Sequence, residues 1–472
     1  MRFPFFVVVP LLLLSLSTNA QSQTFTEVEL MEDIAYLKEA LYKIHPSPFR
    51  YTTKDSMDQN FEILQSKTTS GLTEARFVLE INDLLTSVGC IHTNARRKLK
   101  KIKKGTPRAK VIPFEFYTDG DSLWTKRNLL DTFQNLQWKK VVEINGHSTD
   151  TILQELMDYH ASDGYNTTFM TRLLSRGANL ARLYHSYFGS DSLVNITFQI
   201  SGQDTLAVIP KLRLKSGNNG KGTKEEEAWK FQVKNHFYKE EGNWALLKLN
   251  SFNPYKRKTR KFYRDLFRSL EENEIPNLVI DVRDNLGGSI SDANKVLKHI
   301  LDEDFVILLE RQKAPTFRYS SFGSKVGFIM FSLKRSVECR KKYAKDGKKI
   351  AEFKTRTSGR NNYDGKVFVI TNGYSASSSS YLATLLKYKN QAFIIGEESG
   401  GGAAGNNGLY YTTIRLPNSK IEVRIPFYWL NYQLIPDKGR GVMPDVSIPY
   451  DIEDAKQDKD LEMEWIRYKL GG

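Results

Sequence analysis

The sequence predicts an α/β protein in which a layer of mostly parallel strands follows a helical N-terminal segment and a small β-rich domain. Three observations support this. Apolar residues recur at helical spacing before residue 95, short β-like runs fill residues 111–214, and strands alternate with helices from Trp244 onward. The 472 residues include 40% hydrophobic side chains, a composition that excludes disordered and disulfide-framework proteins.

The N-terminus has the pattern of a signal peptide over residues 1–20. Arg2 precedes an apolar run from Phe5 to Leu14, and small residues lead up to Gln21. The apolar run is too short to span a bilayer comfortably, so we expect cleavage after Ala20. No later segment is long and apolar enough to cross a membrane. The expected product is an exported protein, periplasmic or extracellular, without a membrane span.

Residues 21–110 are expected to form a helical N-terminal segment. Its apolar side chains repeat at helical spacing in two stretches, Ile34, Leu37, Leu41 and Ile44, then Phe77, Ile81, Leu84, Leu85 and Val88. Thr73 can cap the second helix. The segment ends in a basic run from Arg96 to Lys110, which holds part of the net charge of +15. A solvated loop or hairpin is the favoured interpretation, and an anion-docking surface is the alternative.

A small β-rich domain is expected over residues 111–215. Within it, Val141–Ile152 is similar to the second half of the peptide-binding PDZ module, which captures extended peptides at a sheet edge. A polar stretch from Ser216 to Glu227 has the composition of a linker or surface loop. The βαβα pattern then occupies residues 240–450. A long basic insertion at 310–365 interrupts it, and its sequence gives no readable pattern.

Two strand-to-helix junctions in this α/β layer carry residues suited to chemistry. A buried strand ends in Asp281-Val282-Arg283 and turns through Gly287-Gly288, and a second strand from Lys366 leads to Ser377 and Ser378. Because parallel strands present their carboxyl ends at one edge, the Gly288 and Ser378 amides can converge on one carbonyl oxygen beside the Ser377 hydroxyl. Taken singly, each junction is explained as well by a tight turn or by helix capping.

One histidine and two cysteines add to this picture. His92 follows the second N-terminal helix and precedes a polar turn, so it is a candidate base or a structural histidine. Cys90 and Cys339 permit one disulfide, but their positions in the sequence do not show whether the two residues are close in space. For Cys90 the favoured interpretation is a buried structural thiol, and the alternative is a thiol nucleophile. No His/Cys/Asp cluster has metal-ligand spacing, so neither a metal nor another cofactor is expected.

The junctions and the segments that follow them resemble the tail-specific, or C-terminal processing, family of serine peptidases. The resemblance covers about Trp244 to Tyr450 and implies a ClpP/crotonase-like core. Four motifs occur in the family's order, VIDVRDNLGG at Val279–Gly288, YSASSS at Tyr374–Ser379, GEESGGGAAG at Gly396–Gly405 and GRGVMPDVSI at Gly439–Ile448. They imply Ser377 as nucleophile and an oxyanion hole from Gly287, Gly288 and Ser378.

The resemblance also bears on the general base. The family's usual lysine falls at Gly402, and glycine cannot accept a proton. The tricorn-like branch of the family instead uses a histidine from the N-terminal part, assisted by a carboxylate. This chain has Gly89-Cys90-Ile91-His92-Thr93 where many relatives have Gly-Asp-Gly-His-Thr. The resemblance therefore implies His92 as base, and Asp437, which fits with a shift of one residue, as the carboxylate that orients it.

The expected function is that of an exported serine peptidase working through an acyl-enzyme, with peptides or unfolded proteins as substrates. The alternative is a catalytically inactive protein that binds a peptide or lipid ligand on the same scaffold. Nucleic acid is not an expected partner, because the protein is expected to be exported and no nucleic-acid-binding signature surrounds the basic run. The sequence leaves the oligomeric state open.

Overall fold

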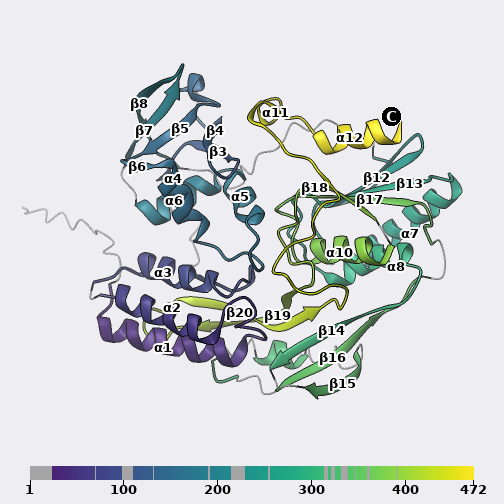
Figure 1. The fold of residues 1–472 in the computed structure, drawn as a ribbon, viewed down its shortest axis with the longest axis horizontal. Helices are drawn as coiled ribbons and strands as arrows, with labels where there is room; N and C mark the ends of the chain where they lie inside the picture. Colours follow the sequence, from purple (N-terminus) through teal and green to yellow (C-terminus); the bar gives the residue numbers. More distant parts are fainter. Residues whose placement is uncertain are drawn as a thin grey trace, which may run out of the picture.

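The computed structural model describes residues 24–69, 71–97, 110–130, 132–189, 192–213, 229–252, 256–312, 317–319, 325–330, 339–345, 347–358, 362–390 and 392–471. The predicted signal peptide, most of the basic run and the polar stretch 216–227 lie outside the described residues. Within the described ranges, no helix combines the length and the apolar character that a membrane crossing requires. Figure 1 shows the N-terminal helices in purple, a β-rich unit in blue and the remaining chain from teal to yellow.

The N-terminal part is helical, as the apolar spacing predicts. It contains α1 (Glu27–Ile44), α2 (Lys54–Lys67) and α3 (Glu74–Thr86). The predicted cap at Thr73 is confirmed, because its side chain accepts a hydrogen bond from the Arg76 amide. The chain then forms the short strand β1 (Asn94–Arg96), which pairs antiparallel with β20 (Glu422–Asn431). This pairing fixes the loop that carries His92 against the C-terminal half of the protein.

The β-rich unit has its own sheet and its own apolar core. The sheet follows the antiparallel order β3-β4-β5-β7-β8, with β6 beside β5. The strands are β3 (Phe114–Thr118), β4 (Leu123–Asn128), β5 (Lys140–Ile144), β6 (His147–Ser148), β7 (Leu193–Ile200) and β8 (Gln203–Pro210). The helices are α4 (Thr149–Met157), α5 (Thr168–Leu174) and α6 (Asn179–Phe188), and a short 3-10 turn, η1 (Gln134–Leu136), precedes β5. The PDZ-like assignment of this unit stays a prediction.

A two-stranded pair closes the β-rich unit. Its members are β2 (Lys110–Val111) and β9 (Leu212–Arg213), which run antiparallel. The chain therefore enters and leaves the unit at one place.

The core sheet has the order β10-β11-β12-β13-β17-β18-β21, and its members from β12 to β21 run parallel. They are β10 (Phe231–Val233), β11 (His236–Glu241), β12 (Trp244–Leu249), β13 (Asn277–Asp281), β17 (Lys366–Thr371), β18 (Phe393–Gly396) and β21 (Val446–Ser447). One face packs against α7 (Lys256–Glu272), α8 (Ile290–Ile300) and α10 (Ser378–Asn390). The predicted α/β class and the strand-helix alternation are confirmed.

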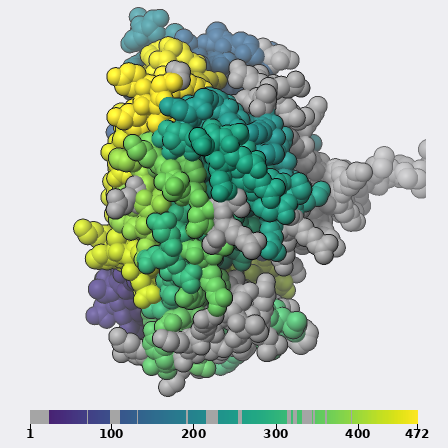
Figure 2. Space-filling model, turned by 90° about the vertical axis from the view of Figure 1, so that its right-hand side faces the viewer, coloured from purple at the N-terminus to yellow at the C-terminus, as the bar shows by residue number. Residues whose placement is uncertain are grey.

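The other face of the core sheet is covered by the C-terminal helix α12 (Leu461–Leu470), which follows α11 (Ile452–Lys456). Met463 and Ile466 of α12 pack on alternate residues of the strands, among them Leu246 and Val279. The C-terminal residues lie at the surface beside the core strands, where Figure 2 shows them in yellow.

A second sheet joins the predicted insertion to the rest of the chain. Its order is β1-β20-β14-β16-β15, with β19 beside β20. The further members are β14 (Phe305–Gln312), β15 (Cys339–Lys345), β16 (Lys348–Thr355) and β19 (Gly405–Arg415), and η2 (Phe317–Tyr319) follows β14. The described part of the insertion therefore includes a β-hairpin, β15 and β16, that extends this sheet, a structure that its basic sequence does not reveal.

A buried cluster of charges ties α12 to the core. The guanidinium of Arg283 donates to Asp281 at 2.9 Å, to Asp460 at 2.6 Å and to Glu462 at 3.0 Å. The side chains of Asp281 and Glu462 are 3% and 1% exposed. Two carboxylates so deeply buried need a positive partner, because an unpaired buried charge is costly. Arg283 of the VIDVRDNLGG motif therefore has a structural role.

We predict that Arg283→Met lowers the free energy of unfolding by about 3–5 kcal/mol, because it leaves Asp281 and Glu462 buried without a cation. Chemical denaturation followed by circular dichroism measures the change. The control is Arg264→Met, whose side chain is 55% exposed beside Asp265, and whose loss should change stability by less than about 1 kcal/mol. Equal effects of the two substitutions would contradict the assigned role of Arg283.

Candidate active site

Ser377 stands on a strained turn between β17 and the N-terminus of α10. Its φ is +55°, in the left-handed region that residues other than glycine rarely adopt. Every residue from Val367 to Leu386 is buried except Ser377, which is partly exposed. Such strain persists only where surrounding structure imposes it, and it is common at functional sites. The turn therefore presents one hydroxyl group at the positive end of a helix.

The glycine turn after β13 packs directly against the Ser377 turn. Gly287 and Gly288 have φ values of +92° and +133°. A Cβ on Gly287 would lie 2.7 Å from the Ser378 amide nitrogen and 2.8 Å from the Ser377 Cβ, and one on Gly288 would lie 2.1 Å from the Phe252 carbonyl oxygen. Neither position can hold a side chain, so the two glycines are required for this close approach.

Hydrogen bonds lock the two turns together. The Ala376 amide donates to the Asn285 carbonyl at 3.1 Å, and the Ser379 hydroxyl donates to the same carbonyl at 2.7 Å. The Ser378 hydroxyl donates to the Gly288 carbonyl at 3.0 Å. The structure thus brings together the predicted residues Ser377, Ser378, Gly287 and Gly288. The Gly287 amide, however, donates to Asn285 Oδ1 at 2.9 Å and is not free to hold an oxyanion.

A cavity of about 200 Å³ opens at this junction. Gly288, Ser377, Ser378 and Tyr411 line it, together with further residues that include Asn406, Leu409 and Tyr432. In the described part of the chain, no hydrogen bond occupies the amide N–H groups of Gly288 and Ser378. Two free donors beside a hydroxyl group are the arrangement that can hold a developing oxyanion.

His92 lies behind the wall of this cavity. Its imidazole stacks on the ring of Tyr411 with centroids 5.4 Å apart, and Tyr411 lines the cavity with Ser377. The Nδ1 atom is sealed from solvent and has no hydrogen-bond partner among the described residues. Burial, together with the positive charge of Arg424, lowers the pKa of His92 to about 3. The imidazole is therefore neutral and holds one free lone pair.

A carboxyl group that sequence reasoning missed lies beside His92. Asp163, in the segment between α4 and α5, accepts hydrogen bonds from the amides of Ile91 at 3.1 Å and Gly402 at 3.3 Å. One ligand atom each from Asp163, His92 and Cys90 lie within 4.8 Å of one another. Burial raises the pKa of Asp163 to about 7. Asp163 precedes a glycine in a sequence typical of a turn, so nothing in the sequence indicates that its side chain lies beside His92.

Cys90 is fully buried and is a free thiol, so the structure does not support a disulfide to Cys339. Burial raises its pKa to about 12, which leaves it protonated and unsuited to nucleophilic attack. The interpretation of Cys90 as a buried thiol is confirmed.

For Asp437, the predicted orienting carboxylate, the described residues show no hydrogen bond to His92 and show other partners instead. The Asp437 carboxylate accepts hydrogen bonds from Arg50 at 3.2 Å, Tyr51 at 3.0 Å and the amide of Gly439 at 2.9 Å. Its turn closes on itself through the last of these bonds and directs the carboxylate to the N-terminal segment.

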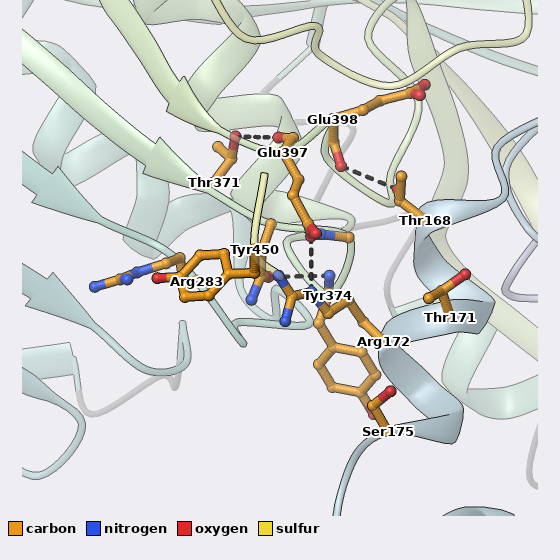
Figure 3. A network of polar contacts seen from close by, with 12 residues as sticks. Thr168, Thr171, Arg172, Ser175, Arg283, Thr371, Tyr374, Glu397, Glu398 and Tyr450 are labelled. Carbon is orange, nitrogen blue, oxygen red and sulfur yellow. Dashed lines mark hydrogen bonds and ion pairs between the residues drawn. The ribbon is translucent and has the colours of Figure 1, made fainter. Parts of the chain in front are cut away.

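Helix α5 of the β-rich unit clamps the strand-end turn that precedes Ser377 (Figure 3). Arg172 donates to Glu397 at 2.7 Å, and the same carboxylate oxygen accepts from the Gly373 amide at 3.1 Å. The Thr168 hydroxyl donates to the Glu398 carbonyl at 3.0 Å.

An aromatic contact adds to this clamp, because the rings of Phe169 and Tyr374 stack with centroids 5.6 Å apart. The β-rich unit is therefore in direct contact with the residues that shape the turn.

Comparison with known proteins agrees with this geometry. Residues 243–448 match the model of peptidase family S41. No curated protein is similar enough in sequence to match the chain. Residues 243–448, which carry the parallel strands of the core sheet and the two turns around Ser377, are thus similar to peptidase family S41.

Solved structures share the fold along nearly the whole chain. Mature CPAF complexed with lactacystin matches with 12% identity and a TM-score of 0.66, over 94% of this chain and 97% of that one. An s499a mutant of CPAF matches with 12% identity and a TM-score of 0.63, over 91% and 94%. A candidate peptidase from Parabacteroides merdae matches with 14% identity and a TM-score of 0.50, over 94% and 97%. At these identities the likeness shows the fold.

The α5 clamp predicts that Arg172→Ala loosens the turn before Ser377. Losing a charge-assisted hydrogen bond of about 1.5–3 kcal/mol should speed amide exchange in the peptide covering Asn372–Ser377 by roughly 10- to 100-fold. Hydrogen–deuterium exchange with mass spectrometry measures it. The control is Arg182→Ala on α6, where the exposed guanidinium contacts only Asn179 among the described residues. Unchanged exchange in the Arg172 variant would show that the clamp does not hold the turn.

Proposed function

We propose that this protein, whose residues 243–448 carry the domain of a serine-type peptidase, cleaves peptide bonds by attack of Ser377 on the substrate carbonyl. The observation that carries the proposal is the cavity at the two strand ends. It places a strained, accessible serine hydroxyl beside the free amides of Gly288 and Ser378.

The residues divide the chemistry among them. The Ser377 oxygen bonds to the carbonyl carbon, and its proton passes to the neutral imidazole of His92. The carbonyl oxygen takes up the negative charge and receives hydrogen bonds from the Gly288 and Ser378 amides. The imidazolium then gives its proton to the leaving amine. Water hydrolyses the acyl-enzyme by the same steps, again with His92 as base.

The assignment of His92 goes beyond the family match. Two observations support it. The His92 ring stacks on Tyr411, a residue of the cavity wall. Gly402 stands where a lysine base would otherwise be, and it has no side chain to accept a proton; its amide donates to Asp163. We assign Asp163 as the positioning residue, because its carboxylate is near enough to stabilise the imidazolium that forms during the reaction.

We also propose that the protein is exported. The support is the signal-like sequence of residues 1–20, with its basic residue, its short apolar run and its small residues before Gln21. The substrates expected in that setting are peptides and unfolded proteins.

We expect a fluorophosphonate probe to label the folded protein at Ser377 and not to label Ser377→Ala. His92→Ala should slow labelling by about 100-fold or more, since a positioned general base contributes roughly 10²–10⁴-fold to such reactions. Intact-protein mass spectrometry and peptide mapping measure the site and the rate. Lactacystin, which CPAF binds in its solved complex, is a second probe and should compete with the fluorophosphonate.

His45→Asn is the matched histidine control for this experiment. His45 is fully buried at the end of α1, and its Nδ1 accepts from the Ser47 amide. The rate at which the probe labels Ser377 in the His45→Asn variant should stay near that of the wild type. A folded wild-type protein that no probe labels would favour the alternative, a ligand-binding protein on a peptidase scaffold.

Export predicts a specific mature N-terminus. When the full-length chain is produced in a bacterium with a secretion system, the protein recovered outside the cytoplasm should begin at Gln21, because cleavage follows Ala20. N-terminal peptide mass spectrometry reads this directly. Arg2→Glu, which removes the basic residue before the apolar run, should leave the uncleaved chain inside the cell. Recovery of uncleaved wild-type protein only from the cytoplasm would reject the proposal.

A further inference from the structure

Three side chains of different chemistry, two buried and one partly exposed, meet beside Tyr411 of the cavity wall. They are the Cys90 thiol, the His92 imidazole and the Asp163 carboxyl group, with one ligand atom of each within 4.8 Å of the others. They come from two segments, the loop after α3 and the segment between α4 and α5. Cys90 and Asp163 are 0% and 3% exposed.

We propose that Cys90, His92 and Asp163 bind a divalent cation of borderline softness, with Zn²⁺ as the best chemical match, and that the bound cation switches the peptidase off. The second half of this inference rests on the proposed function of His92. The first half, binding of the metal, does not.

The donor set favours zinc among common divalent cations. A thiolate, an imidazole and a carboxylate are all established zinc ligands, and a thiolate disfavours Mg²⁺ and Ca²⁺, which take oxygen ligands. With zinc bonds of about 2.0–2.3 Å, two ligands on one tetrahedral ion are about 3.5 Å apart, so the cluster needs movements of only about 1 Å. Three protein ligands leave the fourth position to water.

An independent observation points to a missing partner at this place. The Nδ1 atom of His92 is buried without a hydrogen bond among the described residues. Buried polar atoms are nearly always hydrogen-bonded, so an unpaired one calls for an explanation. The Asp163 carboxylate is already oriented by the Ile91 and Gly402 amides, one on each oxygen. The carboxylate oxygens keep further lone pairs that can bind a cation. Hydrogen bonds to a ligand from groups outside the metal's own ligands, like these two amides, typically fix the ligand's orientation.

The charges balance when the metal enters. Zn²⁺ displaces the proton of the Cys90 thiol, and the proton of Asp163 where that group is protonated, and both protons leave to solvent. One thiolate and one carboxylate neutralise the two positive charges. The loaded site is therefore electrically neutral, which suits its burial.

Metal binding must inactivate His92 whichever ring nitrogen binds. A neutral imidazole has one nitrogen with a free lone pair and one that carries hydrogen. Coordination uses that lone pair, so His92 has nothing left with which to accept the Ser377 proton. A cation at this site is thus a reversible inhibitor that acts on the base and leaves the nucleophile in place.

Cobalt tests the site without any reference to activity. The mature chain, freed of metal by a chelator, is titrated with Co²⁺, and we expect one ion per chain with a thiolate-to-cobalt charge-transfer band that Zn²⁺ removes. Cys90→Ser should abolish the band, and Cys339→Ser, at the only other cysteine, should keep it. Asp163→Asn should weaken binding by at least about tenfold, the loss seen even for outer-shell partners of metals. A band that survives in folded Cys90→Ser, or no band in the wild type, overturns the proposal.

A second measurement tests the regulatory half. The rate at which a fluorophosphonate labels Ser377 is compared with and without Zn²⁺ in each variant. We expect stoichiometric Zn²⁺ to slow labelling at least tenfold in the wild type and in Cys339→Ser, with recovery on adding a chelator, and we expect Cys90→Ser to need at least tenfold more Zn²⁺. If the wild type binds cobalt but Zn²⁺ does not change the rate of Ser377 labelling, the proposed inhibition by the bound cation is contradicted. Metal-free protein that is never labelled would instead defeat the proposed peptidase function, while the cobalt spectra still decide the metal site.

Discussion

The close approach of two backbone turns is the constraint on which the candidate site depends. The turns follow β13 and β17, neighbouring parallel strands whose carboxyl ends lie at one edge of the core sheet. Gly287 leaves no room for a Cβ between them, and the Asn285 carbonyl binds the second turn twice. This packing holds Ser377 in a left-handed conformation and sets Gly288 and Ser378 side by side in the lining of the same cavity. A side chain at Gly287 would separate the hydroxyl from its donors.

The parts of this arrangement that follow from local pattern could be predicted from the sequence. The Thr73 cap, the apolar run of a buried strand and the glycine turn depend on residues close together in the chain. The pairing of the two junctions followed from a general property of parallel sheets, and the motif resemblance identified Ser377 within it. The hairpin in the insertion could not be predicted, because its strands β15 and β16 are rich in lysine and arginine and lack an apolar alternation.

The carboxylate beside His92 shows where sequence reasoning fails. The sequence points to Asp437 because it lies just before the closing motif, but in the structure its carboxylate accepts hydrogen bonds from Arg50 and Tyr51. Asp163 comes from the β-rich unit, which no motif connects with the core. The proposed metal site cannot be predicted from spacing for the same reason, since Cys90 and His92 are two residues apart but their third partner belongs to a different unit. Spacing rules find sites built within one loop, and this one is assembled by tertiary structure.

The pairing of β1 with β20 has a consequence for when the site can exist. It joins Asn94 to Arg424, so the loop that holds His92 is fixed only after almost the entire polypeptide has been synthesised. Contacts of such long range form late and slowly. A nascent chain still emerging from the ribosome therefore lacks the fixed loop that brings His92 to the proposed site.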